Sequence, residues 1–287
     1  MIVVRTIAEL RAAVDPVRAA GSTIGLVPTM GYLHGGHESL MARSVSECDG
    51  TVATIFVNPL QFGVGEDLDA YPRDLDGDTR RAEAAGVDWL FVPSVGEMYP
   101  EPVLTTVSVA KVSQGLEGAS RPTHFDGVST VVTKLFNIVG ACRAYFGEKD
   151  YQQLAVVRRM VADLSMAVEV IGCPTVREPD GLAKSSRNVY LGDAEREAAP
   201  VLHRALRTGA SMIAAGETDP AVVEVAMAAE VATQSLGALD YLAVVDSATL
   251  QPLEVCGPTS RLLGAIRFGR ARLIDNVGVP TTGGSRV

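Results

Sequence analysis

Two histidines that flank two glycines are the first residues along this chain that could form a binding or catalytic site. They form the run His34-Gly35-Gly36-His37. The glycines let the backbone approach a flat or charged ligand closely. A helix that begins near His37 would aim its N–H groups and its positive dipole end at that ligand. Both imidazoles could donate to phosphate oxygens, so the run predicts binding of a phosphate-bearing molecule.

Three further polar runs contain side chains that could bind a ligand or take part in catalysis. They are Asn58 to Phe62, Gly147 to Gln153, and Lys184 to Asn188. Lys149 and Arg187 would add fixed positive charge to the histidine pair. That inventory fits a nucleoside triphosphate and the charge that develops on a transferring phosphorus. The chain has neither the GxxxxGK[ST] run of a P-loop nor a GxGxxG run after the first long strand, which excludes those two nucleotide sites.

Short apolar runs in the first 175 residues are typical of buried strands that position these groups. They cover residues 24–27, 51–57, 89–92, 144–146 and 168–171. Helical apolar stripes at 128–139 and 154–164 lie between them. The alternation predicts a mostly parallel sheet with right-handed crossovers. Each polar run follows one of four strands, and ligands bind at that carboxyl edge, so we expect all four runs in one crevice.

The pattern changes near residue 176. Residues 193–236 are rich in Ala, Glu and Arg and break near Gly216 and Pro220, which predicts two helices. Three short strands are then expected at 241–245, 262–266 and 271–274. The chain is therefore predicted to be α/β, with a parallel-sheet domain over 1–175 and a smaller α+β domain over 176–287.

Each run also has an ordinary structural interpretation. The histidine pair could bind a metal, although no third ligand is evident, and His34 could cap a helix. Lys149 and Asp150 could form a surface ion pair, and Ser185 and Ser186 could be turn residues. The functional interpretation is favoured by the shared placement, because independent causes would not put four such runs at one sheet edge.

Composition narrows the class of partner. The 287 residues are 47% hydrophobic and 21% charged, with a formal net charge of -9 and no Lys/Arg cluster. We therefore expect a small-molecule partner and no nucleic acid. The four cysteines form no CxxC pair, which argues against zinc or a disulfide framework. No signal-peptide pattern and no apolar run of membrane-spanning length is present, so a cytoplasmic protein with no membrane partner is expected.

Taken together, the runs resemble the pantothenate synthetase family, and the resemblance covers nearly the whole chain. The matching segments are Pro28 to His37, Asn58 to Phe62, Tyr71 to Arg73, Arg121 to Phe125, Gly147 to Gln153, and Ser185 to Asn188. An HxGH run alone is shared with aminoacyl-tRNA synthetases and cytidylyltransferases. The Pro-Thr-Met prefix combined with Gly-Glu-Lys-Asp is much narrower.

The resemblance implies a Rossmann-like nucleotidyltransferase fold with a C-terminal lid domain, as a homodimer. It also implies a ligase of pantothenate and coenzyme A biosynthesis with two half-reactions. Pantoate attacks the α-phosphorus of Mg²⁺-bound ATP and releases pyrophosphate. The amine of β-alanine then attacks the pantoyl adenylate and releases AMP.

Residue roles follow from the same resemblance. It makes His37 the main catalytic residue, helped by His34, Lys149 and Arg187. Pantoate and β-alanine would be bound near Gln61, Gln153 and Asn58. No protein ligand to Mg²⁺ is implied. The segments expected to bind ATP are Met30, Gly31, Tyr32, Leu33, His34, Gly35, Gly36, His37, Gly147, Glu148, Lys149, Asp150, Val176, Lys184, Ser185, Ser186 and Arg187.

The chain departs from the family pattern at a few positions. Lys184 replaces an apolar residue, so its side chain points to solvent or else adds a cation at the ATP phosphates. Gly35 replaces a frequent Glu, and Gly77 and Arg81 interrupt an acidic and amide pattern. Two other functions stay open: another HxGH nucleotidyltransferase resembling a cytidylyltransferase, or a non-catalytic nucleotide-binding module. Gln61 and Gln153 argue against a phosphate acceptor, which would call for more Arg or Lys.

Overall fold

The chain divides into two compact units in the computed structural model, which describes residues 1–63, 65–66 and 68–280. The first unit comprises Met1–Glu148 and Gln152–Thr175. The second comprises Lys149–Tyr151 and the chain from Val176 onward.

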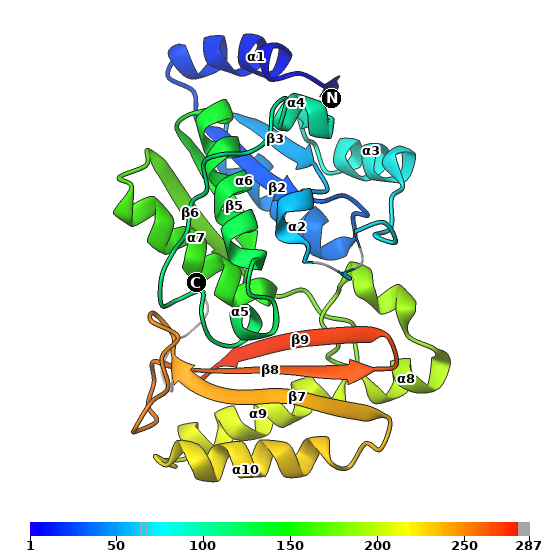
Figure 1. Cartoon of the computed structure of the whole chain (residues 1–287), viewed down its shortest axis with the longest axis vertical. Coiled ribbons are helices and arrows are strands. Elements are labelled where there is room, and N and C mark those ends of the chain that lie inside the picture. The colour runs from blue at the N-terminus through cyan, green and yellow to red at the C-terminus, as the bar shows by residue number, and fades with distance from the viewer. Residues whose placement is uncertain (64, 67, 281–287) are drawn as a thin grey trace. The chain divides into compact units, whose positions relative to one another are not determined.

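A six-stranded parallel sheet forms the centre of the first unit (Figure 1). Its order is β1-β4-β3-β2-β5-β6. The strands are β1 (Ile2–Val4), β2 (Ile24–Thr29), β3 (Gly50–Ile55), β4 (Trp89–Phe91), β5 (Cys142–Gly147) and β6 (Val168–Cys173). The α/β class is therefore confirmed. Strand β1 was not among the strands predicted from the sequence.

Helices cover both faces of this sheet. A Cβ on Gly25 of β2 would lie 1.9 Å from Ser44 Oγ, so α2 packs closely on the face of Gly25. The opposite face carries Phe146 of β5, whose ring centroid is 6.4 Å from that of Phe136 in α6. The helices of the unit are α1 (Ile7–Ala19), α2 (Gly35–Glu47), α3 (Leu75–Ala84), α4 (Val95–Met98), α5 (Glu117–Ser120), α6 (His124–Val139) and α7 (Tyr151–Asp163) from Gln152 onward, with the 3-10 turn η1 (Pro59–Gln61). The 3-10 turn η2 (Glu148–Asp150) begins in the first unit and continues in the second.

The second unit is a three-stranded antiparallel sheet with helices against one face (Figure 1). Buried residues from both layers, among them Leu206, Met227 and Ile266, form its core. The elements are η3 (Ser186–Tyr190), α8 (Asp193–Ala198), α9 (Val201–Ala214), α10 (Pro220–Val231), β7 (Gly237–Asp246), β8 (Ser260–Phe268) and β9 (Ala271–Gly278).

The prediction of two helices over residues 193–236 is wrong, because the structure has three. Helix α8 ends at Ala198, and Pro200 occupies the N-cap position of α9. Proline has no N–H, so Pro200 cannot donate to the carbonyl four residues back, and the hydrogen-bond ladder is interrupted there although Ala199 keeps helical dihedrals. A break at Pro200 therefore separates α8 from α9, in addition to the predicted break before Pro220.

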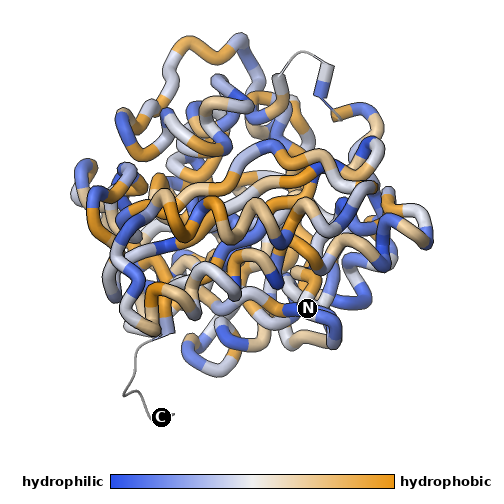
Figure 2. Tube along the Cα trace, turned by 90° about the horizontal axis from the view of Figure 1, so that it is seen from below, coloured by the Kyte–Doolittle hydropathy of each residue, from blue (hydrophilic) through white to orange (hydrophobic). Residues whose placement is uncertain are grey.

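Apolar and polar residues alternate along the chain in short stretches (Figure 2). Within the described residues, no helix is long and apolar enough to cross a membrane. All four cysteines are free, and three of them are buried.

Candidate active site

Three of the four polar runs begin at the ends of neighbouring strands. Strands β3, β2 and β5 are adjacent in the sheet and parallel. The histidine run follows β2, the run from Asn58 follows β3, and Gly147 ends β5 with Glu148 directly after it. The carboxyl ends of parallel strands share one edge of a sheet. The topology thus brings these runs together within the first unit. Residues 184–188 belong to the second unit, and their place in the crevice stays a prediction.

The two histidines form the N-terminus of α2. His34 is the N-cap, and its Nδ1 accepts the Gly36 N–H at 3.1 Å. His37 Nδ1 in turn lies 3.4 Å from the His34 backbone nitrogen. Their ring centroids are 4.1 Å apart. Since each Nδ1 acts as an acceptor, a neutral ring carries its proton on Nε2, from which it could donate to a phosphate. The capping interpretation of His34 is correct and compatible with a role in binding.

A buried carboxylate fixes the turn before these histidines. Asp78 of α3 is 3% exposed and accepts from the backbone nitrogens of Tyr32 at 2.8 Å and Leu33 at 2.6 Å. Burial raises the pKa of Asp78, although the two N–H groups oppose that shift. Gly31 has φ +84°, and a Cβ there would lie 2.9 Å from both Asp78 Oδ2 and Ile55 Cγ2. The turn therefore requires glycine at position 31.

Asp78 is not recognisable as a site residue from the sequence. The neighbouring positions 77 and 81 depart from the family pattern, but nothing in the local sequence indicates that Asp78 points back to the turn. The clue available was an acidic residue in the first turn of a helix, which is common for reasons of the helix dipole alone.

Three predicted residues meet in a buried amide cluster beside the histidine turn. Asn58 is 1% exposed, and its Nδ2 donates to Gln61 Oε1 at 3.2 Å. Gln61 Nε2 lies 3.0 Å from Met30 Sδ. A thioether is a weak acceptor, so a ligand carboxylate or hydroxyl would be a better partner for this amide. Tyr99, which the sequence analysis missed, donates to Asn58 Oδ1 at 2.9 Å, and burial raises its pKa to about 12.

Helix α6 and the loop before it hold the amide cluster through hydrogen bonds to the Gln61 carbonyl and the Asn58 side chain. His124 Nδ1 lies 2.9 Å from the Gln61 carbonyl oxygen, to which Arg121 also donates at 3.2 Å. The Gly127 carbonyl accepts from Asn58 Nδ2 at 3.1 Å. A Cβ on Gly127 would lie 2.2 Å from the Leu60 carbonyl oxygen. The close approach of α6 to η1 thus depends on glycine at position 127.

The two glutamines at the start of α7 differ. Gln152 is 3% exposed and bonds to the backbone of Val112, Gly115 and Glu117, so it holds that loop. Gln153 is half-buried. No side-chain hydrogen bond of Gln153 to another described residue is present, which leaves its amide able to bind a ligand.

In the second unit a short hairpin leads into the predicted phosphate segment. Lys184 N donates to the Val176 carbonyl at 2.9 Å, and Glu178 N donates to the Leu182 carbonyl at 2.8 Å. Lys184 Nζ lies 3.5 Å from Glu178 Oε1 across this hairpin. The Lys184 side chain is ion-paired and 31% exposed, and a role of its cation at the ATP phosphates stays a prediction. Ser185 then caps η3 by accepting from Arg187 N at 3.3 Å.

The ion pair expected between Lys149 and Asp150 after β5 is compatible with the proposed phosphate-binding role of Lys149. Lys149 Nζ lies 3.5 Å from Asp150 Oδ1, so the ion pair is present. The Lys149 side chain is nevertheless 19% exposed rather than fully solvated. An ion pair between adjacent residues at this distance is weak and could open for a phosphate.

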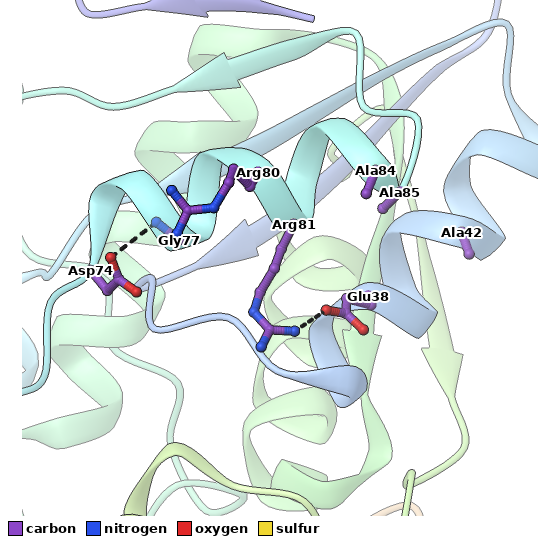
Figure 3. Close-up of a pocket in the computed structure, with 8 residues that line it drawn as sticks. All are labelled: Glu38, Ala42, Asp74, Gly77, Arg80, Arg81, Ala84 and Ala85. Carbon is purple, nitrogen blue, oxygen red and sulfur yellow. Dashed lines mark hydrogen bonds and ion pairs between the residues drawn. The ribbon is translucent and has the colours of Figure 1, made fainter.

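A groove of about 560 Å³ separates α2 from α3 on the first unit (Figure 3). Arg81 crosses it to Glu38, with Nη1 2.5 Å from Oε1, and Asp74 caps α3 through Gly77 N at 2.9 Å. Arg81 therefore joins α3 to α2, whereas Gly77 belongs to the N-terminal cap of α3 itself. Within the described residues, no group of three or more His, Cys, Asp or Glu side chains could hold a metal ion.

A parallel sheet with a histidine pair at the N-terminus of the helix after its central strand defines a Rossmann-like nucleotide-dependent enzyme. Comparison with known proteins narrows the class. The family model for pantoate-beta-alanine ligase matches residues 2–278. Pantothenate synthetases from Heliobacterium modesticaldum and Sinorhizobium medicae are 52% and 53% identical over 277 residues. The match covers 96% of this chain and 99% and 95% of those proteins. The chain belongs to the pantoate–β-alanine ligase family, and its activity is the ligation of pantoate to β-alanine.

Solved structures agree. Pantothenate synthetase from Thermus thermophilus matches with a TM-score of 0.93 and 51% identity over 98% of this chain and all of that one. The pantoate-beta-alanine ligase of Francisella tularensis, solved in complex with β-γ ATP and β-alanine, matches with a TM-score of 0.81 and 34% identity over 98% of both chains. The family prediction is confirmed, and the alternative of a non-catalytic module is set aside.

Proposed function

We propose that the ligation uses ATP and proceeds through a pantoyl adenylate. A pantoate carboxylate oxygen attacks the α-phosphorus of ATP, and the bond from that phosphorus to pyrophosphate breaks. The β-alanine amine then attacks the acyl carbon, and the bond from that carbon to the AMP oxygen breaks as the amine loses a proton. Mg²⁺ enters with ATP as part of the substrate. The ligands in the Francisella structure support this proposal.

The observation that carries the proposal is the amide cluster beside the histidine turn. Gln61 Nε2 now points at Met30 Sδ, a weak acceptor that pantoate oxygens can replace. Amide groups suit a hydroxylated acid because they bind its oxygens without adding a repelling negative charge. Asn58 and Tyr99 hold Gln61 in place, and Gln153 is the second amide assigned to pantoate.

The ATP phosphates are assigned to side chains that donate hydrogen bonds or carry positive charge. His34 and His37 can donate from Nε2 at the positive end of the α2 dipole. His37 is the main catalytic residue because it stabilises charge that grows on the α-phosphorus. Lys149 and Arg187 are proposed to contribute fixed charge at the phosphates, and Asp150 to bind the ribose. The remaining nucleotide contacts are proposed for Gly31, Tyr32, Leu33, Gly35, Gly36, Gly147, Glu148, Val176, Lys184, Ser185 and Ser186.

The test is pyrophosphate release from ATP and Mg²⁺ with pantoate, with and without β-alanine. We expect release that requires pantoate, and formation of AMP and pantothenate once β-alanine is added. Trapping of a pantoyl adenylate when β-alanine is withheld would establish the intermediate. Pyrophosphate that appears only when all three substrates are present, with no adenylate trapped, would contradict a two-step route.

The proposal includes a homodimer that acts in the cytoplasm. The family resemblance supports the dimer, and the four free cysteines suit a reducing compartment. Light scattering on a sizing column would test the first part, with a mass near twice 30.2 kDa expected. A mass of one chain at micromolar concentration would contradict it.

A further inference from the structure

Three residues after β5 group with the second unit although their neighbours on both sides belong to the first. They are Lys149–Tyr151. Asn276 of β9 donates from Nδ2 to the Lys149 carbonyl oxygen at 3.0 Å. The Arg261 guanidinium lies 3.9 Å from the centroid of the Tyr151 ring, and Tyr151 OH donates to the Ser247 carbonyl at 3.0 Å. The backbone that carries Lys149 is therefore held by the antiparallel sheet.

The residue before Asn276 holds the hairpin that leads to Ser185. Asp275 is 6% exposed and receives both arms of Arg177, with Nη1 at 2.6 Å and Nη2 at 2.9 Å. Arg177 Nη1 also donates to the Gly181 carbonyl at 3.0 Å, which ties the guanidinium to the far end of the same hairpin. A bidentate pair of this kind fixes orientation as well as distance.

The two anchors act through opposite faces of β9, because successive side chains of a strand alternate. Asp275 pairs in register with Gly264, where a Cβ would meet Leu202 of α9 at 2.9 Å, so it lies on the helix-covered face. Asn276 pairs with Leu263 on the other face. Arg261 donates to Asn276 Oδ1 from that same face and so orients the amide, leaving Nδ2 for Lys149.

We propose that Asp275 and Asn276 are positioning residues that hold two ATP-phosphate segments, with Asn276 fixing the Lys149 backbone and Asp275 fixing the hairpin before Ser185. This inference rests on the proposed function, since it presumes that Lys149 and residues 184–187 bind phosphate. One strand, β9, thereby sets the spacing between the Lys149 backbone and the hairpin before Ser185. Neither Asp275 nor Asn276 needs to touch the nucleotide.

Asn276→Asp tests the first anchor with little change in shape. The carboxylate still accepts from Arg261 but cannot donate to the Lys149 carbonyl. Asn276→Leu removes the donor without adding charge, which separates loss of the bond from repulsion of ATP. We expect both variants to raise the KM for ATP about threefold to tenfold, the worth of one hydrogen bond, with the KM for pantoate within twofold of wild type.

Arg177→Lys tests the second anchor while keeping a positive charge at that position. A lysine cannot bridge both Asp275 oxygens and the Gly181 carbonyl, so the same selective rise in the KM for ATP is expected. Asp240→Asn is the matched control, because it breaks an ion pair with Arg272 in the same sheet, 2.8 Å long, away from both segments. It should leave both KM values unchanged.

A purely structural role predicts a different pattern. Loss of folded enzyme would lower kcat with both KM values unchanged, and that result, or KM values for ATP within twofold of wild type in all three test variants, would overturn the inference. The Kd of the β,γ-imido analogue of ATP provides a measure independent of turnover. Wild type that binds the analogue but releases no pyrophosphate with pantoate would reject the proposed function alone, and the variant Kd values would still decide the positioning. Wild type that fails to bind the analogue would reject both.

Discussion

Asp78 and Leu33 are joined by a 2.6 Å hydrogen bond across 45 positions of sequence. The carboxylate of α3 thereby fixes the backbone turn from which His34 and α2 begin. Its second oxygen accepts from Tyr32, which has φ +50°, in the left-handed region. The turn is strained, and Asp78 is the group that holds it.

Replacing Asp78 with Asn should therefore impair catalysis through the histidines. An amide accepts from one of the two N–H groups and presents its own N–H₂ to the other, which leaves a buried donor without a partner. We expect a loss of about 1–3 kcal/mol in unfolding free energy and a fall in kcat of roughly tenfold or more, since a small misplacement of catalytic groups is costly. Steady-state pyrophosphate release and a denaturant titration would measure the two effects. A variant with normal kcat would show that the turn holds without Asp78.

His37 can be tested for phosphate chemistry apart from capping, because its two ring nitrogens have separate roles. His37→Ala removes both, whereas His37→Asn can keep an acceptor for the His34 N–H and lacks Nε2. We expect both variants to lose about 10²–10³-fold in adenylate formation. Recovery of activity in His37→Asn would mean that capping, not donation to the nucleotide, is the contribution of His37.

The sequence carried enough information for the long strands and for the grouping of the motifs. β2, β3 and β5 were predicted because apolar or β-branched runs of three to seven residues end in Pro, Asn or Gly, and the shared edge follows from parallel pairing. Contacts between segments that are far apart in the sequence could not be predicted from it. Asp78 belongs to the site through two hydrogen bonds that span 46 and 45 positions, and Tyr99 through one that spans 41, and no local pattern records such contacts.

The same limit applied to Gln152 and Gln153, which are adjacent and identical in type. Only the structure shows that Gln152 is committed to a loop and that Gln153 is not. The extra helix break at Pro200 is different, because proline chemistry predicts it. Composition predicted one helix between residue 193 and Gly216, and Pro200 divides that segment into α8 and α9.

Gly127→Ala should loosen the pantoate cluster. The new Cβ would meet the Leu60 carbonyl oxygen at 2.2 Å, so α6 must move away from η1. Overpacking of this kind costs roughly 1–3 kcal/mol, and we expect the KM for pantoate to rise more than the KM for ATP. Gly115→Ala is the control, because nothing lies within 4 Å of a Cβ there. Equal effects of the two substitutions would contradict the assignment.

Lys184→Met would decide whether the unusual lysine contacts phosphate. Its ion pair with Glu178 is partly exposed, and such pairs contribute about 0–1 kcal/mol. We expect a KM for ATP within twofold of wild type and a small change in melting temperature. A rise of tenfold or more in the KM for ATP would show that Lys184 leaves Glu178 to reach the nucleotide.

Asp275 should link the stability of the second unit to acid pH. Burial alone would raise its pKa, but the His203 ring and the Arg177 guanidinium overcome that and hold the pKa below the ordinary 3.8. A carboxyl group whose pKa is lower in the folded state stabilises the fold above its unfolded pKa, and that contribution is lost as the pH falls through the folded pKa.

Asp275→Asn leaves Arg177 largely buried without its counter-ion and should cost about 3 kcal/mol at neutral pH. The difference in melting temperature between wild type and Asp275→Asn should be constant from pH 7 to about 5 and shrink as the pH falls below 3.8. A difference that grew under acid conditions would mean that Asp275 is not the charged partner of Arg177.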